Sequence, residues 1–312
     1  MNMTPSTHDL LDQGARKPKP SVRLFASEPM NRLPARNGAV ATRSGRGRLE
    51  VKLVSGQSAV TSAWANSPLK LLVPKPRGPS VWAYSSSFGG GLVAGDEIKL
   101  TLDIGDGARC FVGSQASTKV YRNPAASPCS HTLDATVGRD SLLVLAPDPV
   151  QAFASSSYVQ RQQFHLHESG GLVLVDWFCS GRAARGERWA FDRFQSRNEI
   201  FINGSRVLLD SLLLDSARSP LTTSYRLGRF NCLGLVLVAG QSLREAGVRM
   251  LKEIDAHSIS RRASLVCSAS PTSHGVLLRF AGESAEMVGA EIRRHLSFVP
   301  GLLHDDPWSR KW

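Results

Sequence analysis

Alternation of apolar and polar residues over short segments is the feature that most constrains the fold of this 312-residue chain. Residues 48–53 and 98–104 carry apolar side chains at every second position. This period places one face of a strand against a core and the other in water. About a dozen such segments without helices between them predict a mainly β body. The remaining strands are expected near 108–112, 133–137, 141–145, 158–167, 172–179, 194–201, 206–214 and 232–238.

Two glycine-containing turns suggest how these strands pair. Gly105-Asp106-Gly107 supplies residues that accept a positive φ, so we expect a tight reversal into an antiparallel partner at 108–112. Gly138-Arg139-Asp140 marks a second turn of this kind. We therefore expect stacked, antiparallel-rich sheets.

The C-terminal part of the chain shows a helical period instead. Apolar residues recur at helical spacing over 242–256, where Ser242 and Glu245 form the pattern of a capping box. A second helix is expected over about 283–297, ended by Pro300-Gly301. Two short strands, near 263–268 and 274–280, separate the helices.

The N-terminal segment differs from both parts. Residues 1–46 are rich in Pro, Ser, Arg and Asn and show no period, which predicts a disordered basic leader. We therefore divide the chain into a leader at 1–46, a β body at 47–240 and an α+β portion at 241–312 packed on that body.

Composition narrows the class of protein. No apolar run approaches the roughly 20 residues of a membrane-spanning helix, and no membrane association is expected. The 5 cysteines are scattered without a CxxC pair, which favours a reducing, cytoplasmic setting. The net charge of +12 predicts an anionic partner. On charge alone an acidic protein, nucleic acid and an anionic membrane all fit, but no nucleic-acid-binding motif accompanies the charge.

A glycine-rich segment at 88–96 has two interpretations. Its residues can cradle a phosphate, or they can form a tight turn between strands. No Lys-Ser/Thr pair follows the last glycine, as a P-loop requires, and a strand pattern follows instead of a helix. We interpret the segment as a structural turn made by Gly89, Gly90, Gly91, Gly95 and Asp96.

Three further segments combine polar and charged residues. Ser117, Thr118, Lys119 and Arg122 either line a polar cleft or belong to a solvated strand edge. Asp148 is held between two prolines, where it can bind a cation or accept backbone hydrogen bonds.

The third segment contains Asp176, which falls in an apolar strand where an unpaired carboxylate is costly. Arg182, Arg185 and Arg188 are candidates to neutralise Asp176 and Glu187. Such a group forms either a buried ion-pair network or a charged passage or docking surface.

The sequence contains no motif that indicates catalysis. His165 and His167 lie two apart and can offer two imidazoles to one metal ion, but most such pairs are surface residues. A metallohydrolase built on them is the rival enzyme hypothesis. The sequence contains no GxSxG, no HExxH and no dinucleotide fingerprint. We therefore expect no catalytic residues.

Four segments, taken in order, resemble one family. GGGLVAGD, SQASTKVYR, PDPV and SGRAARGERWAF are similar to successive signature blocks of the urease accessory proteins called UreD, or UreH in some systems. The resemblance runs from about Arg48 to at least Asp215, and more loosely to the C-terminus. Ala94 and Ser114 depart from the residues usual in the family, Gly and Thr, but both changes are small.

The resemblance implies a fold and a function. Members have stacked, distorted solenoid-like β sheets with two helices, and they are scaffolds rather than enzymes. They join a helical accessory protein, UreF, and a GTPase, UreG, and dock on apo-urease. Nickel is then inserted as the GTPase hydrolyses GTP, so GTP acts on the partner and this chain holds nickel only transiently. Nucleic acid is not among the implied partners.

The implied nickel passage suggests roles for the residues named above. A divalent cation in transit needs carboxylate, hydroxyl or imidazole groups that bind it weakly. The hypothesis assigns the lining of the passage to Asp148, Asp176, Glu187, Ser117 and Thr118. Charge balance or partner contact is assigned to Lys119, Arg122, Arg182 and Arg188.

Overall fold

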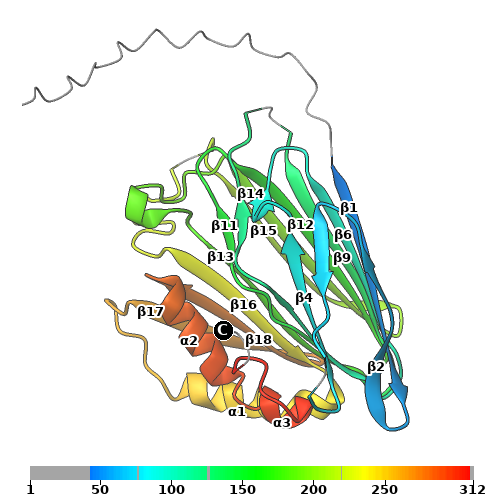
Figure 1. Cartoon of the computed structure of the whole chain (residues 1–312). Helices are drawn as coiled ribbons and strands as arrows, with labels where there is room; N and C mark the ends of the chain where they lie inside the picture. The colour runs from blue at the N-terminus through cyan, green and yellow to red at the C-terminus, as the bar shows by residue number, and fades with distance from the viewer. Residues whose placement is uncertain (1–42, 76, 125–126, 219, 310–312) are drawn as a thin grey trace, which may run out of the picture. The chain divides into compact units, whose positions relative to one another are not determined.

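The computed structural model describes residues 43–309 except 76, 125–126 and 219, so the expected leader lies outside it apart from its last residues (Figure 1). Within these residues the strands form two sheets. Strand β1 begins at Ser44, inside the segment assigned to the leader. In spatial order, the seven-stranded sheet contains β15 (Ser205–Asp215), β14 (Arg193–Ile202), β12 (Ser157–Leu166), β9 (Cys129–Val137), β6 (Glu97–Ile104), β1 (Ser44–Val54) and β2 (Gln57–Ala65).

The eleven-stranded sheet faces the first one. Short strands β5, β8 and β11 pair beside its main path. Its members are β17 (Leu265–Thr272), β18 (Gly275–Gly282), β16 (Cys232–Ala239), β13 (Gly171–Cys179), β10 (Leu142–Leu145), β7 (Arg109–Ser114), β4 (Val81–Ser87) and β3 (Leu69–Leu72), with β11 (Val150–Ala152), β8 (Thr118–Val120) and β5 (Gly91–Leu92) off the path.

The chain winds between the sheets as a coil. It passes from β6 to β7, from β9 to β10 and from β12 to β13, changing sheet each time. Because equivalent strands of successive coils run the same way, β6, β9, β12 and β14 are parallel neighbours. The expected antiparallel pairing of 98–104 with 108–112 is wrong, since β6 and β7 lie in different sheets. Antiparallel pairs occur towards the ends of the sheets, as in β1–β2 and β14–β15.

The glycine-containing turns form corners of the coil rather than hairpins. Successive corners bind each other through hydrogen bonds. The amide of Gly107 donates to the carbonyl of Arg139 at 2.7 Å, and the amide of Arg139 donates to the Asp106 carboxylate at 2.7 Å. The amide of Asp140 donates in turn to Ser169 Oγ at 3.1 Å. Polar corner residues thus satisfy backbone groups that a two-residue hairpin would pair internally.

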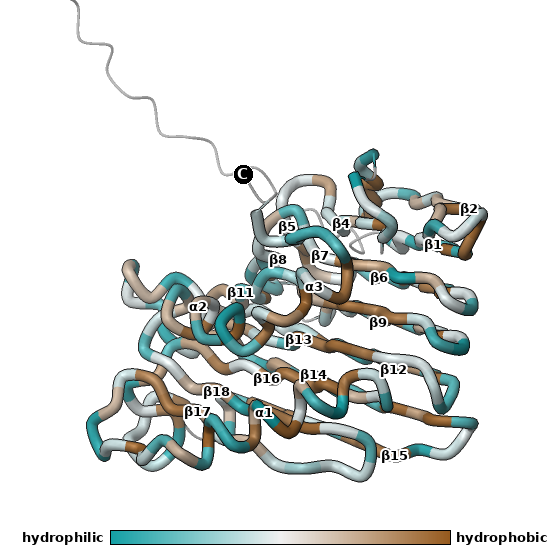
Figure 2. Tube along the Cα trace, turned by 90° about the horizontal axis from the view of Figure 1, so that it is seen from below, coloured by the Kyte–Doolittle hydropathy of each residue, from teal (hydrophilic) through white to brown (hydrophobic). Residues whose placement is uncertain are grey.

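Two apolar cores lie on the two faces of the eleven-stranded sheet. One lies between the sheets and includes Leu100, Leu172 and Phe194. The other lies under the helices and includes Val236 and Ile292. Helix α1 (Arg244–Asp255) packs on β17 and β18, α2 (Ala285–His295) on β16 and β18, and α3 (Val299–Leu303) on β7. In Figure 2 the trace is brown along much of the strands and teal at many turns.

The mainly β, solenoid-like fold class is confirmed. The expectation of antiparallel-rich sheets is wrong, because ten of the sixteen strand pairings in the described residues are parallel. The described residues are about 49% strand and 13% helix, in a solenoid-like stack of strands with the α-helices at the C-terminal end. Both expected helices are present, and α3 is an additional short helix that contains Pro300. The strands β17 and β18 extend the sheet of the β body.

The expected capping box is not formed. Ser242 lies in a 3₁₀ turn (Gln241–Leu243), and α1 has no side-chain cap. The cap forms at α2 instead, where Ser284 accepts from the amide of Met287. In the described part of the chain, no helix is both long and apolar enough to cross a membrane.

Candidate functional site

Polar side chains meet between the two sheets, where an apolar core would be expected. Gln160 and Gln162 occupy inward positions of β12, and Ser196 and Asn198 occupy inward positions of β14. Asp176 of β13 faces them from the other sheet. Together with His131 of β9, these residues form a row that we call the polar seam. The register aligns His131 with Gln160 and Gln160 with Ser196 on neighbouring strands.

Asp176 joins the two sheets through hydrogen bonds. Its Oδ1 accepts from Gln160 Nε2 at 2.8 Å. Its Oδ2 accepts from Ser196 Oγ at 2.7 Å and from Asn198 Nδ2 at 2.9 Å. All of these donors are neutral, and no arginine or lysine contacts Asp176 in the part of the chain that the structure describes. The expected neutralisation of Asp176 by Arg182, Arg185 and Arg188 is therefore wrong.

Further hydrogen bonds hold the seam in place. Tyr158 donates to Gln160 Oε1 at 3.1 Å, and Gln162 Nε2 donates to Asn198 Oδ1 at 2.9 Å. Burial raises the pKa of Tyr158 well above its usual value, so its hydroxyl keeps its proton. A buried hydrogen-bonded network of this kind fixes the orientation of the side chains that it joins.

One end of the seam opens into a pocket at the side of the sandwich. The pocket has a volume of about 440 Å³ and is lined by Asp176 and Ser196 and by an ion pair of Asp210 and Arg279. Asp210 on β15 and Arg279 on β18 come from different sheets, and their charged atoms lie 2.6 Å apart. The pocket thus brings a carboxylate of the seam within reach of solvent.

A smaller pocket lies at the other end, with a volume of about 70 Å³. It contains Ser117 and Thr118, so these two predicted residues lie together near His131. We call it the serine pocket. Its polar lining residues are Ser85, Ser86, Ser87, Ser117, Thr118 and His131, and the rest of its lining is apolar or glycine: Leu69, Gly90, Leu92, Ile98 and Ala116.

The other predicted lining residues lie elsewhere. Asp148 sits on the helix side, in a separate pocket with Trp177, and Ser114 Oγ bonds both its carboxylate, at 3.1 Å, and its amide, at 2.7 Å. Glu187 is paired with Arg182, which holds the pKa of this carboxyl below its usual value. The five proposed lining residues therefore fall into four places, since only Ser117 and Thr118 lie together.

The predicted charged residues also separate. Arg182 pairs with Glu187 and lies over the Phe153 ring at 4.5 Å. Arg188 binds no carboxylate among the described residues and instead donates to Asn231 Oδ1 at 2.6 Å and to the Gly228 carbonyl at 2.8 Å. Lys119 and Arg122 are exposed.

The glycine-rich segment forms a turn that leads into β6. Gly89, Gly90 and Gly95 have positive φ angles, and the Asp96 carboxylate accepts from the amide of Val93 at 3.0 Å. Gly91 serves a different purpose, because it lets β5 approach β8. A Cβ at this position would lie 2.5 Å from the carbonyl oxygen of Lys119 and 2.6 Å from the Tyr121 ring.

We therefore expect Gly91→Ala to destabilise the protein by about 1–3 kcal/mol, the usual effect of overpacking. Gly301→Ala is the matched control, since its Cβ would meet nothing within 4 Å; we expect a change within about 0.5 kcal/mol. Denaturant unfolding of both variants measures the difference. Equal midpoints would show that the close approach of β5 to β8 has no energetic consequence.

The histidine pair does not form a metal site. His165 is exposed and stacks on Phe201 with ring centroids 4.7 Å apart, while His167 binds Ser169. No group of three or more His, Cys, Asp or Glu residues in the described residues is arranged to hold a metal ion.

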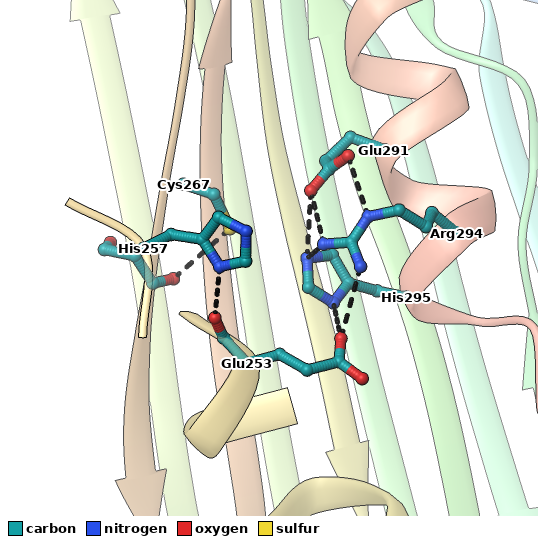
Figure 3. Close-up of polar contacts among 7 residues, drawn as sticks. Glu253, His257, Cys267, Glu291, Arg294 and His295 are labelled. Carbon is teal, nitrogen blue, oxygen red and sulfur yellow. Dashed lines mark hydrogen bonds and ion pairs between the residues drawn. The ribbon is translucent and has the colours of Figure 1, made fainter. Parts of the chain in front are cut away.

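A second polar cluster lies between α1, α2 and β17 (Figure 3). Arg294 donates to Glu291 on its own helix at 2.7 Å and to Glu253 of α1 at 3.2 Å. The buried His295 ring lies 3.2 Å from Glu291, and burial lowers the pKa of this histidine. These contacts fasten α1 to α2.

Most of the polar seam was not predicted from the sequence. Gln160 and Gln162 alternate along β12 with outward residues in the same way as the buried Tyr158 and Phe164. Their inward direction was therefore visible in the sequence. His131 lies two positions before the buried Leu133 on β9, so it points to the same face of the strand. No local pattern in the sequence shows which residues of the opposite sheet these side chains contact.

Comparison with known proteins identifies similar chains. Residues 43–312 match the family model described as UreD urease accessory protein. A protein of Sorangium cellulosum named urease accessory protein UreD is 45% identical over 87% of this chain and 86% of its own length. An Anaeromyxobacter protein of the same name is 38% identical over 94% of this chain and 98% of its own. Urease accessory protein D of Arabidopsis thaliana is 33% identical over 84% of this chain and 99% of its own length.

Proposed function

Because the chain belongs to the UreD family of urease accessory proteins, we propose that it is a non-enzymatic scaffold for nickel insertion into urease. In this proposal it joins a UreF-type helical protein and a UreG-type GTPase in the cytoplasm and docks on apo-urease. GTP hydrolysis takes place on the GTPase. Nickel is cargo that passes through the chain rather than a resident cofactor.

The observation that carries the proposed passage is the bonding of Asp176. Its carboxylate is held between the sheets by neutral amide and hydroxyl donors. A carboxylate without a cationic partner keeps its attraction for a cation, and that attraction is strengthened where water is scarce. Asp176 also lines the 440 Å³ pocket, so a cation from solvent can reach it.

The rest of the seam suits transit rather than storage. Amide and hydroxyl oxygens bind a divalent cation weakly, whereas tight sites gather several carboxylate, imidazole or thiolate ligands. The described residues contain no such gathering. A cation at Asp176 would therefore be attracted by one charge and released without breaking a complete coordination sphere.

Asp176→Asn tests the passage. The variant keeps the shape of the side chain and removes its charge. An interaction with a charged group contributes about 1.5–3 kcal/mol, so we expect nickel delivery to urease to fall by about tenfold or more. The assay co-expresses the full chain with cognate partners and urease, and it measures the nickel content and activity of purified urease.

The control is Asp134→Asn, which removes a carboxylate paired with Lys99 at 3.2 Å on the outer face of the seven-stranded sheet. We expect this variant to deliver nickel like the wild type. Normal nickel delivery by Asp176→Asn would refute the passage. Failure of the wild-type chain to co-purify with its cognate partners would refute the scaffold assignment itself.

A further inference from the structure

The serine pocket contains one nitrogen donor among hydroxyl groups. His131 comes from β9 of the seven-stranded sheet, whereas Ser85 and Thr118 come from β4 and β8 of the other sheet. The pocket thus lies between the sheets, at the end of the seam opposite Asp210 and Arg279. Gly90 and Ala116 also line it and are exposed, so the pocket is open to solvent.

The His131 ring is suited to donate a lone pair. No hydrogen bond occupies its nitrogen atoms within the described residues. The ring is only partly buried and lines the serine pocket. A neutral imidazole is the form that binds metal ions.

We propose that His131, with the hydroxyl groups of Ser117 and Thr118, forms a transient binding site for a borderline divalent transition-metal ion. The site would be one binding point along the proposed nickel passage, and its biological role rests on that proposed function. The register neighbour of His131, Gln160, is hydrogen-bonded to Asp176, so the site lies at one end of the seam.

The size and chemistry of the serine pocket limit what it can hold. One water needs about 10–15 Å³ of accessible cavity volume, so the pocket of about 70 Å³ holds a metal ion with a few waters. Imidazole suits nickel, zinc and copper, whereas magnesium prefers oxygen ligands and keeps its waters. One nitrogen and neutral hydroxyls bind weakly, which fits a site that must release its ion. The site therefore selects by ligand type rather than by tight binding.

The test uses the full-length chain without a histidine tag, labelled with ¹³C at the histidine Cε1 position. The His131 signal is the one that disappears in His131→Gln. Substoichiometric Ni²⁺ should broaden this signal in the wild type, because the ion is paramagnetic, and Mg²⁺ should leave it unchanged. In equilibrium dialysis, His131→Gln should weaken Ni²⁺ binding by about tenfold or more, the range seen when partners of metal ligands are lost.

His165→Gln is the matched control, since it makes the same substitution at an exposed residue of the neighbouring strand β12. We expect it to keep the broadening of His131. Thr118→Val tests the pocket without touching the imidazole, and it should lower the affinity by a smaller factor. If Ni²⁺ broadened other histidines and left His131 unchanged, the site would be disproved. This binding readout does not involve urease, so it separates failure of the site from failure of the proposed passage, which Asp176→Asn reports.

Discussion

Replacing Phe194 by alanine is expected to destabilise the protein by about 3–5 kcal/mol, the range for removing a buried aromatic side chain. Phe194 is fully buried between the sheets. Its ring stacks on Phe178 of the opposite sheet with centroids 4.1 Å apart, and it lies 5.5 Å from Tyr158 and 5.9 Å from Phe191. The deletion leaves a cavity at a junction of several rings, which the strands cannot close without moving. Denaturant unfolding followed by circular dichroism measures the loss.

Tyr225→Ala provides the control, because this side chain is 79% exposed. We expect its free energy of unfolding to change by no more than about 0.5 kcal/mol. A loss below about 1 kcal/mol in Phe194→Ala would be smaller than any fully buried aromatic deletion should give. It would show that the two sheets are not held together by this aromatic cluster.

Acidification is expected to remove about 3 kcal/mol of stability through His131 alone. Burial lowers its pKa from 6.5 to about 4 in the folded chain, and each pKa unit corresponds to 1.36 kcal/mol. Below pH 6.5 the unfolded chain takes up a proton on this ring that the folded chain does not accept. The contribution is therefore complete above about pH 6.5 and is lost as the pH falls to about 4.

The free energy of unfolding, measured from pH 7.5 to 4, tests this. His131→Gln should lose about 3 kcal/mol less than the wild type over this range. Carboxylates such as Glu199, whose pKa is lowered to about 2 by Arg197 and its other partners, contribute equally to both proteins and cancel. His165→Gln should follow the wild type. Parallel curves for wild type and His131→Gln would show that the ring is hydrated enough to be protonated in the folded state.

The sequence alone determined where most of the long strands lie and which of their side chains point inward, but it did not predict β2, β3 or β4. Residues 98–104, 158–167 and 172–179 were predicted as strands and correspond closely to β6, β12 and β13. The C-terminal helices and the family resemblance were visible as well. Each of these depends on periodicity or on short blocks, which are local properties of the chain.

Only the tertiary structure decided which strands pair and which polar groups meet. Alternation assigns a residue to a face of a strand but not to a sheet, so a corner at Gly105–Gly107 looked like a hairpin. Asp176 is bonded to residues 16 to 22 positions away, Gln160, Ser196 and Asn198, and not to the arginines next to it in the chain. Those contacts follow from the coiling of the chain between the sheets, which brings together inward positions of successive coils. Because this winding is non-local, the seam and the position of His131 in the serine pocket emerged only from the folded molecule.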